Sequence, residues 1–294
     1  MAEPRALLRE AAARLRAAGV ASPEHDAAEL LAHVLGITRA QLALVTDVAS
    51  GRAQRYDALL IRRAAREPLQ HLLGAAWFRH VEVAVGPGVF VPRPETELLA
   101  GWAIEQAAGL VATGSAPVVV DLCTGSGVIA KSIANEVPQA RVFAVELDPP
   151  AHAWAERNLA GTGVELRLGD LATAFDDLAG RVDVLVSNPP YVPLKAWESV
   201  AAEARDHDPY LALFSGDDGL DAIRAIARRG LVLLRPGGVV GVEHADVQGE
   251  SAPAVFSRGG WEQVRDHRDL AGRARFATAR RPHPERRAVG GWAT

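Results

Sequence analysis

The sequence predicts an α/β fold, in which a mostly parallel sheet carries helices on both faces and follows a small all-α bundle and a β-hairpin linker. Three observations support this prediction. Residues 5–66 place apolar side chains at helical spacing. The period changes from Trp77 onward, and residues 81–85 alternate apolar with polar or small side chains, as a half-buried strand does. Beyond residue 93, short apolar runs alternate with helical patterns, which favours parallel strands joined by crossover helices.

The N-terminal bundle contains three predicted helices. The first presents an apolar stripe that Gly19 ends. The second has a clear start signal in Ser22 and Pro23, and its apolar face ends at Gly36. The third covers about residues 52–66. These residues therefore form a unit separate from the sheet.

A hairpin is predicted next, because the alternating residues 81–85 lead through Gly86-Pro87-Gly88 into the apolar Val89-Phe90-Val91. A helix over about residues 95–108 then precedes the strands. The strand candidates are residues 118–122, 142–145, 164–168, 182–186 and 239–242, with Phe276–Ala279 as a late antiparallel edge strand. The predicted parts are a helical domain (1–74), a hairpin linker (75–92), an α/β domain (93–281) and a disordered tail (282–294).

The composition is typical of a soluble globular protein. Of 294 residues, 49% are apolar, which is enough to bury a sizeable core. The single cysteine, Cys123, excludes a disulfide framework and a thiolate metal cluster. His71, His207 and His244 have no metal-ligand spacing, so no metal site is expected. Without an export signal or a long apolar segment, we expect a cytoplasmic protein.

Charge is distributed unevenly along the chain. Residues 76–257 contain 13 basic and 24 acidic residues, a formal net charge of −11, whereas residues 258–287 contain 9 and 4, a net charge of +5. A nucleic-acid substrate favours a basic catalytic face. The acidic central region therefore argues against direct nucleic-acid binding.

A loop with two glycines follows the first strand of the predicted sheet. The stretch Asp121-Leu122-Cys123-Thr124-Gly125-Ser126-Gly127 runs directly into a helical pattern, so that backbone amides point at a ligand. Glu146 ends the next strand, where a carboxylate can accept both hydroxyls of a ribose. Asp170 follows the third strand and is placed to meet an adenine amino group. Taken singly, each acid can equally be a helix cap or a solvated loop residue, and Cys123 is better explained as a small buried filler than as a nucleophile.

Taken together, the three carboxylates indicate an adenosine-containing ligand. A pyrophosphate would be repelled by them at close range, whereas a positive sulfonium would be attracted. The chain also has no Gly-Lys-Ser/Thr sequence for a phosphate-binding P-loop. We therefore expect S-adenosylmethionine in preference to NAD or ATP.

The tetrad Asn188-Pro189-Pro190-Tyr191 lies just after the apolar run 182–186, at the carboxyl end of a predicted buried strand. Its two prolines remove two backbone donors and fix φ, so the Asn188 side-chain oxygen and the Pro189 carbonyl are held as acceptors. Such a pocket suits a planar NH2 group, whose two hydrogens are both accepted while the Tyr191 ring lies against its plane. The structural alternative is a turn that only ends a strand.

With both motifs in place, the chain resembles class I S-adenosylmethionine-dependent amino-methyltransferases, which modify adenine N6, cytosine N4 or the side-chain nitrogen of glutamine. Three further stretches resemble the peptide chain release factor N5-glutamine methyltransferase family. They are residues 67–74 (EPLQHLLG), 87–97 (PGVFVPRPETE) and 212–220 (ALFSGDDGL). The resemblance runs from about Glu67 to Phe276 and includes an N-terminal helical bundle of the expected kind.

This resemblance implies a Rossmann-like class I methyltransferase whose N-terminal domain docks the substrate. The implied reaction transfers a methyl group from S-adenosylmethionine to N5 of the glutamine in the Gly-Gly-Gln motif of class-1 release factors, leaving S-adenosylhomocysteine. The residues expected to bind the donor are Asp121, Cys123, Thr124, Gly125, Ser126, Gly127, Glu146, Asp170, Leu171 and Asn188. The residues expected to bind the substrate are Asn188, Pro189, Pro190 and Tyr191, and of these Asn188, Pro189 and Tyr191 are expected to act in catalysis.

The chain departs from the family pattern at two positions, since relatives usually have glycine in place of Cys123 and often an aromatic residue in place of Leu171. Three other functions compete with the implied one. The first is a nucleic-acid amino-methyltransferase acting on adenine N6 or cytosine N4, the second a non-catalytic S-adenosylmethionine-binding adaptor, and the third a nicotinamide dehydrogenase. We expect a monomer without a membrane or nucleic-acid partner.

Overall fold

The computed structural model describes residues 2–283, which form two compact units. The first unit comprises Met1–Ala76, Val85–Pro87 and Ala201–Asp208. The second comprises Trp77–Ala84, Gly88–Val200 and Pro209–Thr294. The first unit thus includes a short segment from far along the chain, which no local sequence pattern indicated. The predicted disordered tail lies outside the described residues from residue 284 onward.

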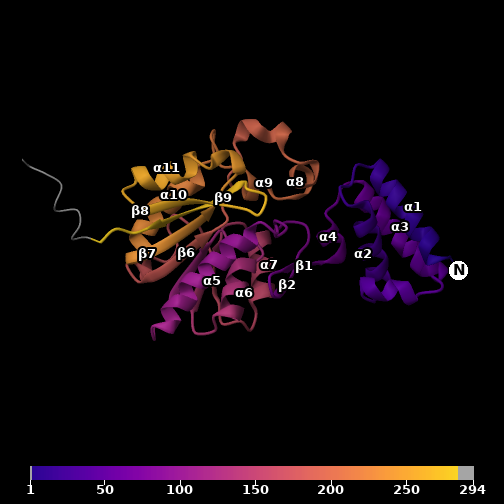
Figure 1. Ribbon diagram of the computed structural model, residues 1–294, viewed down its shortest axis with the longest axis horizontal. Coiled ribbons are helices and arrows are strands. Elements are labelled where there is room, and N and C mark those ends of the chain that lie inside the picture. Colours follow the sequence, from indigo (N-terminus) through magenta and orange to yellow (C-terminus); the bar gives the residue numbers. More distant parts are fainter. Residues whose placement is uncertain (1, 284–294) are drawn as a thin grey trace, which may run out of the picture. The chain divides into compact units, whose positions relative to one another are not determined.

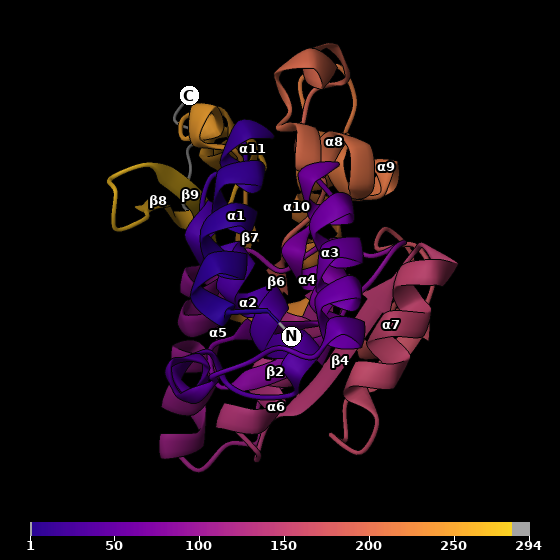
Figure 2. The ribbon, with the colours of Figure 1, turned by 90° about the vertical axis from the view of Figure 1, so that its right-hand side faces the viewer.

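The first unit is a helical bundle. Its helices are α1 (Pro4–Ala17), α2 (Pro23–Leu35), the 3-10 helix η1 (Arg39–Leu44), α3 (Ser50–Ala64), α4 (Leu69–Leu73) and α8 (Ala202–His207). Helix α2 packs against both α1 and α3 (Figure 2). Pro23 occupies the first turn of α2 and Ser22 the N-cap position, although the Ser22 side chain makes no capping hydrogen bond. Gly36 ends α2 with a φ of 71°, a left-handed conformation that glycine adopts without strain.

Arg63 explains why α8 belongs to this bundle. Its buried guanidinium donates from Nε to Asp26 Oδ2 (2.8 Å) and from Nη2 to Glu203 Oε1 (2.9 Å). Arg66 contributes a second ion pair to Glu203 at 2.8 Å. A buried charge is tolerated only when it is paired and hydrogen bonded, so this network fixes the helix that carries Glu203.

The β-hairpin is confirmed, but it lies earlier in the chain than predicted. Its strands are β1 (Ala75–Phe78) and β2 (Val81–Ala84), so the chain reverses at Arg79 and His80. The apolar residues 89–91 form no strand. They lie between prolines, which cannot donate to a ladder of backbone hydrogen bonds.

The second unit contains a seven-stranded sheet with strand order β5-β4-β3-β6-β7-β9-β8. Its strands are β3 (Val118–Leu122), β4 (Arg141–Glu146), β5 (Glu165–Leu168), β6 (Val182–Ser187), β7 (Leu234–Glu243), β8 (Glu262–Arg268) and β9 (Ala274–Arg280). The first five strands in this order pair in parallel, and β9 pairs antiparallel with both β7 and β8. The mostly parallel sheet is therefore confirmed.

One prediction about the end of this sheet was wrong, and one strand there was missed. Phe276–Ala279 lies in β9, which is antiparallel as predicted, but it sits between β7 and β8 and is not an edge strand. The edge is β8, which no pattern indicated because Val264 is the one aliphatic residue among its seven. Charged side chains on an edge strand discourage pairing with other chains, so an edge need not be apolar.

Helices cover both faces of the sheet, as predicted (Figure 1). Helices α5 (Thr96–Ala112), α6 (Val128–Glu136) and α7 (Pro149–Leu159) lie on one face, and α10 (Asp221–Leu233) and α11 (Ser251–Arg258) lie on the other. The connections hold α9 (Tyr210–Leu213) and the 3-10 helices η2 (Asp176–Leu178), η3 (Leu194–Ser199) and η4 (Asp246–Gln248). Among the described helices, none is long and apolar enough to cross a membrane. The parallel strands end together at one edge of the sheet, which is where ligands bind in such folds.

Candidate active site

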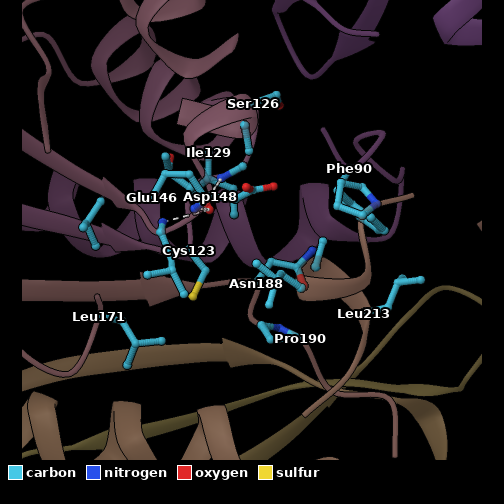
Figure 3. Close-up of a pocket in the computed structure, with 18 of the residues that line it drawn as sticks. Phe90, Cys123, Ser126, Ile129, Glu146, Asp148, Leu171, Asn188, Pro190 and Leu213 are labelled. Atoms are coloured by element: carbon cyan, nitrogen blue, oxygen red, sulfur yellow. Dashed lines mark hydrogen bonds between the residues drawn. The ribbon is translucent and has the colours of Figure 1, made fainter. Parts of the chain in front are cut away.

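A cavity opens at the carboxyl ends of β3, β4, β5 and β6, entirely within the second unit (Figure 3). It holds about 1160 Å³ of empty space, its open mouth included. Of the predicted site residues, its wall contains Cys123, Thr124, Gly125, Ser126, Glu146, Asp170, Leu171, Asn188, Pro190 and Tyr191. Asp121, Gly127 and Pro189 are not part of the wall. The structure thus brings the glycine loop, two strand-end acids and most of the tetrad around one space.

The glycine loop is built from left-handed backbone. Gly125 and Gly127 have φ values of 57° and 82°, and Gly127 is the N-cap of α6. Cys123 also has a positive φ, 61°. For a residue with a Cβ this conformation costs about 1–2 kcal/mol, which gives a physical reason why glycine suits this position. Burial raises the pKa of the Cys123 thiol, so the thiol is neutral and is not a nucleophile.

Glu146 organises this loop through its carboxylate. Oε2 accepts the Gly125 N–H (2.8 Å), while Oε1 accepts the N–H groups of Leu147 and Asp148 (both 2.9 Å). Burial raises the pKa of Glu146, and these amide hydrogen bonds oppose the rise. One side chain at the end of β4 therefore holds both the glycine loop and the turn that follows β4.

The other two strand-end acids have different surroundings. Asp121 is fully buried beneath the loop, where Oδ2 accepts the Thr124 hydroxyl (2.6 Å) and the Ala130 N–H (3.2 Å). Burial raises the pKa of Asp121 to about 7. Asp170 is exposed at the cavity wall, and its Oδ1 accepts the Ala172 N–H at 2.8 Å. Asp121 thus supports the loop from below, while Asp170 faces the space itself.

The tetrad directs one polar side chain into the cavity. Asn188 donates from Nδ2 to the Thr96 hydroxyl at 3.2 Å. No residue within the described range donates a hydrogen bond to its Oδ1, so this oxygen is available to a ligand. Figure 3 shows Asn188 and Pro190 in the cavity between Cys123 and Leu213.

Tyr191 is held by a buried carboxylate. Its hydroxyl donates to Glu243 Oε1 at 3.3 Å, and burial raises the pKa of Tyr191. Burial also raises the pKa of Glu243 to about 7, against the effect of hydrogen bonds from Thr96 and Tyr191. The same carboxylate is therefore linked to Tyr191 directly and to Asn188 through Thr96.

The backbone behind the tetrad is also fixed. The Tyr191 carbonyl accepts a hydrogen bond from Gln248 Nε2 (3.1 Å). Gly219, with a φ of 75°, lies so close that a Cβ there would be 2.2 Å from the Tyr191 carbonyl oxygen. The Val192 N–H donates to the carbonyl of Leu213, the last residue of α9 (2.8 Å). A rigid tetrad is consistent with a preorganised site.

The charge of the wall has one sign. Glu146, Asp148 and Asp170 line the cavity, and no Lys, Arg or His does so among the described residues. Nor does any group of three His, Cys, Asp or Glu within residues 2–283 have the arrangement of a metal site. A positive ligand is favoured in such a cavity and a phosphate is disfavoured.

The sequence did not reveal several residues of the site. Phe90 and Thr96 line the cavity from the stretch before and at the start of α5, and Leu213 lines it from the end of α9. All three lie in residues 87–97 or 212–220, the stretches that resemble the family, but nothing in those stretches indicated a role for these side chains. Glu243 ends an apolar strand, and a carboxylate at that place was a signal that could have been used.

Comparisons with known proteins agree with this geometry. Residues 6–74 match the family described as the PrmC N-terminal domain, and residues 108–207 match the methyltransferase small domain. A release factor glutamine methyltransferase of Streptomyces coelicolor is 55% identical over 94% of this chain and 97% of that protein. A 4-amino-L-phenylalanine/4-methylamino-L-phenylalanine methyltransferase of Streptomyces pristinaespiralis is 42% identical over 87% and 88%. The hMettl16 catalytic domain, solved with a MAT2A 3′UTR hairpin, has a TM-score of 0.52 at 14% identity over 82% of this chain and 85% of that one, which shows the fold alone.

Proposed function

Since this chain belongs to the release factor glutamine methyltransferase family, we propose that it methylates N5 of the glutamine in the Gly-Gly-Gln motif of class-1 peptide chain release factors. The methyl donor is S-adenosylmethionine. The observation that supports this most is the orientation of Asn188, which donates to Thr96 and leaves its Oδ1 facing an acid-lined cavity. An exposed carbonyl oxygen beside an aromatic ring is an acceptor for a carboxamide NH2.

The wall suits the donor. The wall residues Cys123 to Ser126, which precede the N-terminus of α6, would hold its methionine end, and Glu146 and Asp170 offer acceptors for ribose and adenine. Leu171 supplies an apolar contact in place of aromatic stacking. When bound, the donor supplies an electrophilic methyl carbon on a positive sulfur, which the three acids of the wall favour.

The protein's task is to orient a weak nucleophile. The lone pair of an amide nitrogen is delocalised into its carbonyl. Asn188 Oδ1 accepts one of its hydrogens, and the Tyr191 ring lies against its plane. The Pro189 carbonyl, which the sequence predicts as the second acceptor, is not part of the cavity wall, and its role stays a prediction. The tetrad would hold the amide nitrogen toward the methyl carbon of the bound donor, which would leave as neutral S-adenosylhomocysteine, and the methylated nitrogen would lose one proton to solvent. No strong base is required, because the methylated nitrogen is acidic before that loss.

We further propose that the helical bundle docks the release factor and that the chain acts as a monomer in the cytoplasm. The match of residues 6–74 to a domain that accompanies this family supports the docking role. Deleting residues 2–66 should raise KM for the release factor far more than KM for the donor.

The test is incubation of the purified chain with labelled S-adenosylmethionine and purified class-1 release factors, followed by mass spectrometry. We expect one added methyl group on the glutamine of the Gly-Gly-Gln peptide, and label that enters far more slowly with the Asn188→Ala variant. Parallel reactions contain DNA, RNA or 4-amino-L-phenylalanine. Label that enters only one of these and leaves the release factor unmodified would overturn the proposal.

A further inference from the structure

Two buried side chains behind the tetrad differ from ordinary core residues in being polar. Thr96, the first residue of α5, is 2% exposed, and Glu243, the last residue of β7, is 4% exposed. Thr96 is 92 residues from Asn188 in sequence, and Glu243 is 52 residues from Tyr191. Each of these two pairs is nevertheless joined by a hydrogen bond. Buried polar groups are retained where they are paired, so their pairing pattern is informative.

The direction of these hydrogen bonds follows from the chemistry of the groups. An ionised Glu243 has only acceptors, so it accepts the hydroxyl protons of both Thr96 and Tyr191. The Thr96 oxygen then has only lone pairs to offer Asn188. It therefore selects the amide nitrogen of Asn188, as the 3.2 Å contact shows.

We propose that Thr96 and Glu243 are positioning residues that fix which way the Asn188 carboxamide points. They turn Nδ2 toward α5 and thereby turn Oδ1 toward the acceptor substrate. The catalytic consequence rests on the proposed function, whereas the orientation itself does not. Glu243 also holds the Tyr191 hydroxyl, so one carboxylate sets two of the tetrad's side chains.

The arrangement has a pH dependence whose sign is determined. Because burial raises the pKa of Glu243 to about 7, the group is a carboxylate above that pH and a neutral acid below it. Arg275 on β9 lowers this pKa and Glu95 beside α5 raises it, while Arg93 faces Tyr191. A neutral Glu243 donates its own proton to one hydroxyl. When Thr96 receives it, the Thr96 hydroxyl turns to Asn188 and favours the reversed carboxamide.

Nuclear magnetic resonance tests the orientation without any substrate. The chain has three asparagines, Asn135, Asn158 and Asn188, so a sample labelled with 15N at asparagine gives three side-chain NH2 signals. Asn158 is an internal control, since its Nδ2 donates to the carbonyls of Ala84 and Ser126 (both 2.9 Å). We expect the Asn188 signal to shift with a midpoint near pH 7, and the Asn158 signal to stay constant.

Two variants locate the cause. Thr96→Val and Glu243→Gln should each abolish the shift of the Asn188 signal near pH 7. Thr96→Val should lower kcat about tenfold, with KM for the donor unchanged, and Thr96→Ser should restore most of the loss. Thr278→Val is the matched control, because it removes a buried hydroxyl that pairs with His267 away from the site, and its kcat should equal that of the unmodified chain.

The outcomes separate this inference from the proposed function. An Asn188 signal that is identical in the unmodified chain, Thr96→Val and Glu243→Gln overturns the inference, and Glu243→Gln alone provides this test if Thr96→Val fails to fold. A folded Thr96→Val variant with full kcat overturns it as well. If the unmodified chain leaves release factors unmethylated while the Asn188 signal titrates as described, the proposed substrate is wrong and the orientation by Thr96 and Glu243 stands.

Discussion

The two ends of the cavity are built by different means. At the donor end, backbone amides and left-handed turns form the wall, and the Glu146 carboxylate holds them in place. At the acceptor end, the side chains of Asn188 and Tyr191 form the binding surface, and their orientation depends on Thr96 and Glu243. Ligand binding at a site built from backbone groups depends on the conformation of the chain. At a site built from side chains it depends on the position of each polar atom. Substitutions should therefore affect donor affinity at one end and turnover at the other.

The largest effect is expected at the acceptor end. Asn188→Ala removes an acceptor of the substrate amide and should lower kcat on the order of 100-fold, the loss typical for one preorganised catalytic hydrogen bond. The affinity for S-adenosylhomocysteine, measured by isothermal titration, should stay within about twofold because the donor wall remains. A variant that keeps its kcat but loses donor affinity would reverse the assignment of the two ends.

Gly219→Ala should disturb the same end through the backbone. Its Cβ would lie 2.2 Å from the Tyr191 carbonyl oxygen, so the tetrad must shift and kcat should fall about tenfold. Gly163→Ala is the matched control, because Gly163 also has a positive φ (80°) but has open space around its Cβ position. That control should lose only about 1 kcal/mol of unfolding free energy and keep its kcat. Equal kinetics for the two variants would show that the tetrad does not need its backbone position.

At the donor end, Glu146→Gln should raise the dissociation constant of S-adenosylhomocysteine about tenfold, which corresponds to about 1.4 kcal/mol. The cause is that an amide has one acceptor oxygen where the carboxylate uses two to hold three N–H groups. With saturating donor, kcat should change little. Glu165→Gln, an exposed change on the neighbouring strand, should leave binding unaltered. A loss in kcat without a loss in affinity would contradict the division of roles.

The smallest effect is expected at Cys123. Cys123→Gly and Cys123→Ala both remove the thiol, but alanine keeps the strain of a φ of 61° and glycine does not. The glycine variant should therefore be more stable than the alanine variant by about 1 kcal/mol, measured by chemical denaturation. Identical stabilities would mean that the loop relaxes when the side chain is shortened.

The sequence predicted the part of the fold that local patterns encode. The strands β3, β4 and β6 are apolar runs buried on both faces, so they stand out. The edge strand β8 does not, because most of its side chains are polar. The hairpin was misplaced because Gly86-Pro87-Gly88 is a stronger turn signal than Arg79 and His80, where the chain reverses.

The same limit applies to the site. The glycine loop and the tetrad are contiguous in sequence and could be identified directly. Thr96 and Glu243 act through contacts with residues 92 and 52 positions away, and only the fold brings those pairs together. Their role depends on the direction of each hydrogen bond, which no local motif encodes.

The most direct measurement is the structure of this chain with S-adenosylhomocysteine and a peptide that contains Gly-Gly-Gln. We expect the glutamine NH2 to donate to Asn188 Oδ1 beside the Tyr191 ring, while Asn188 Nδ2 still donates to Thr96. A glutamine bound elsewhere, or an Asn188 side chain that presents its nitrogen to the substrate, would contradict it.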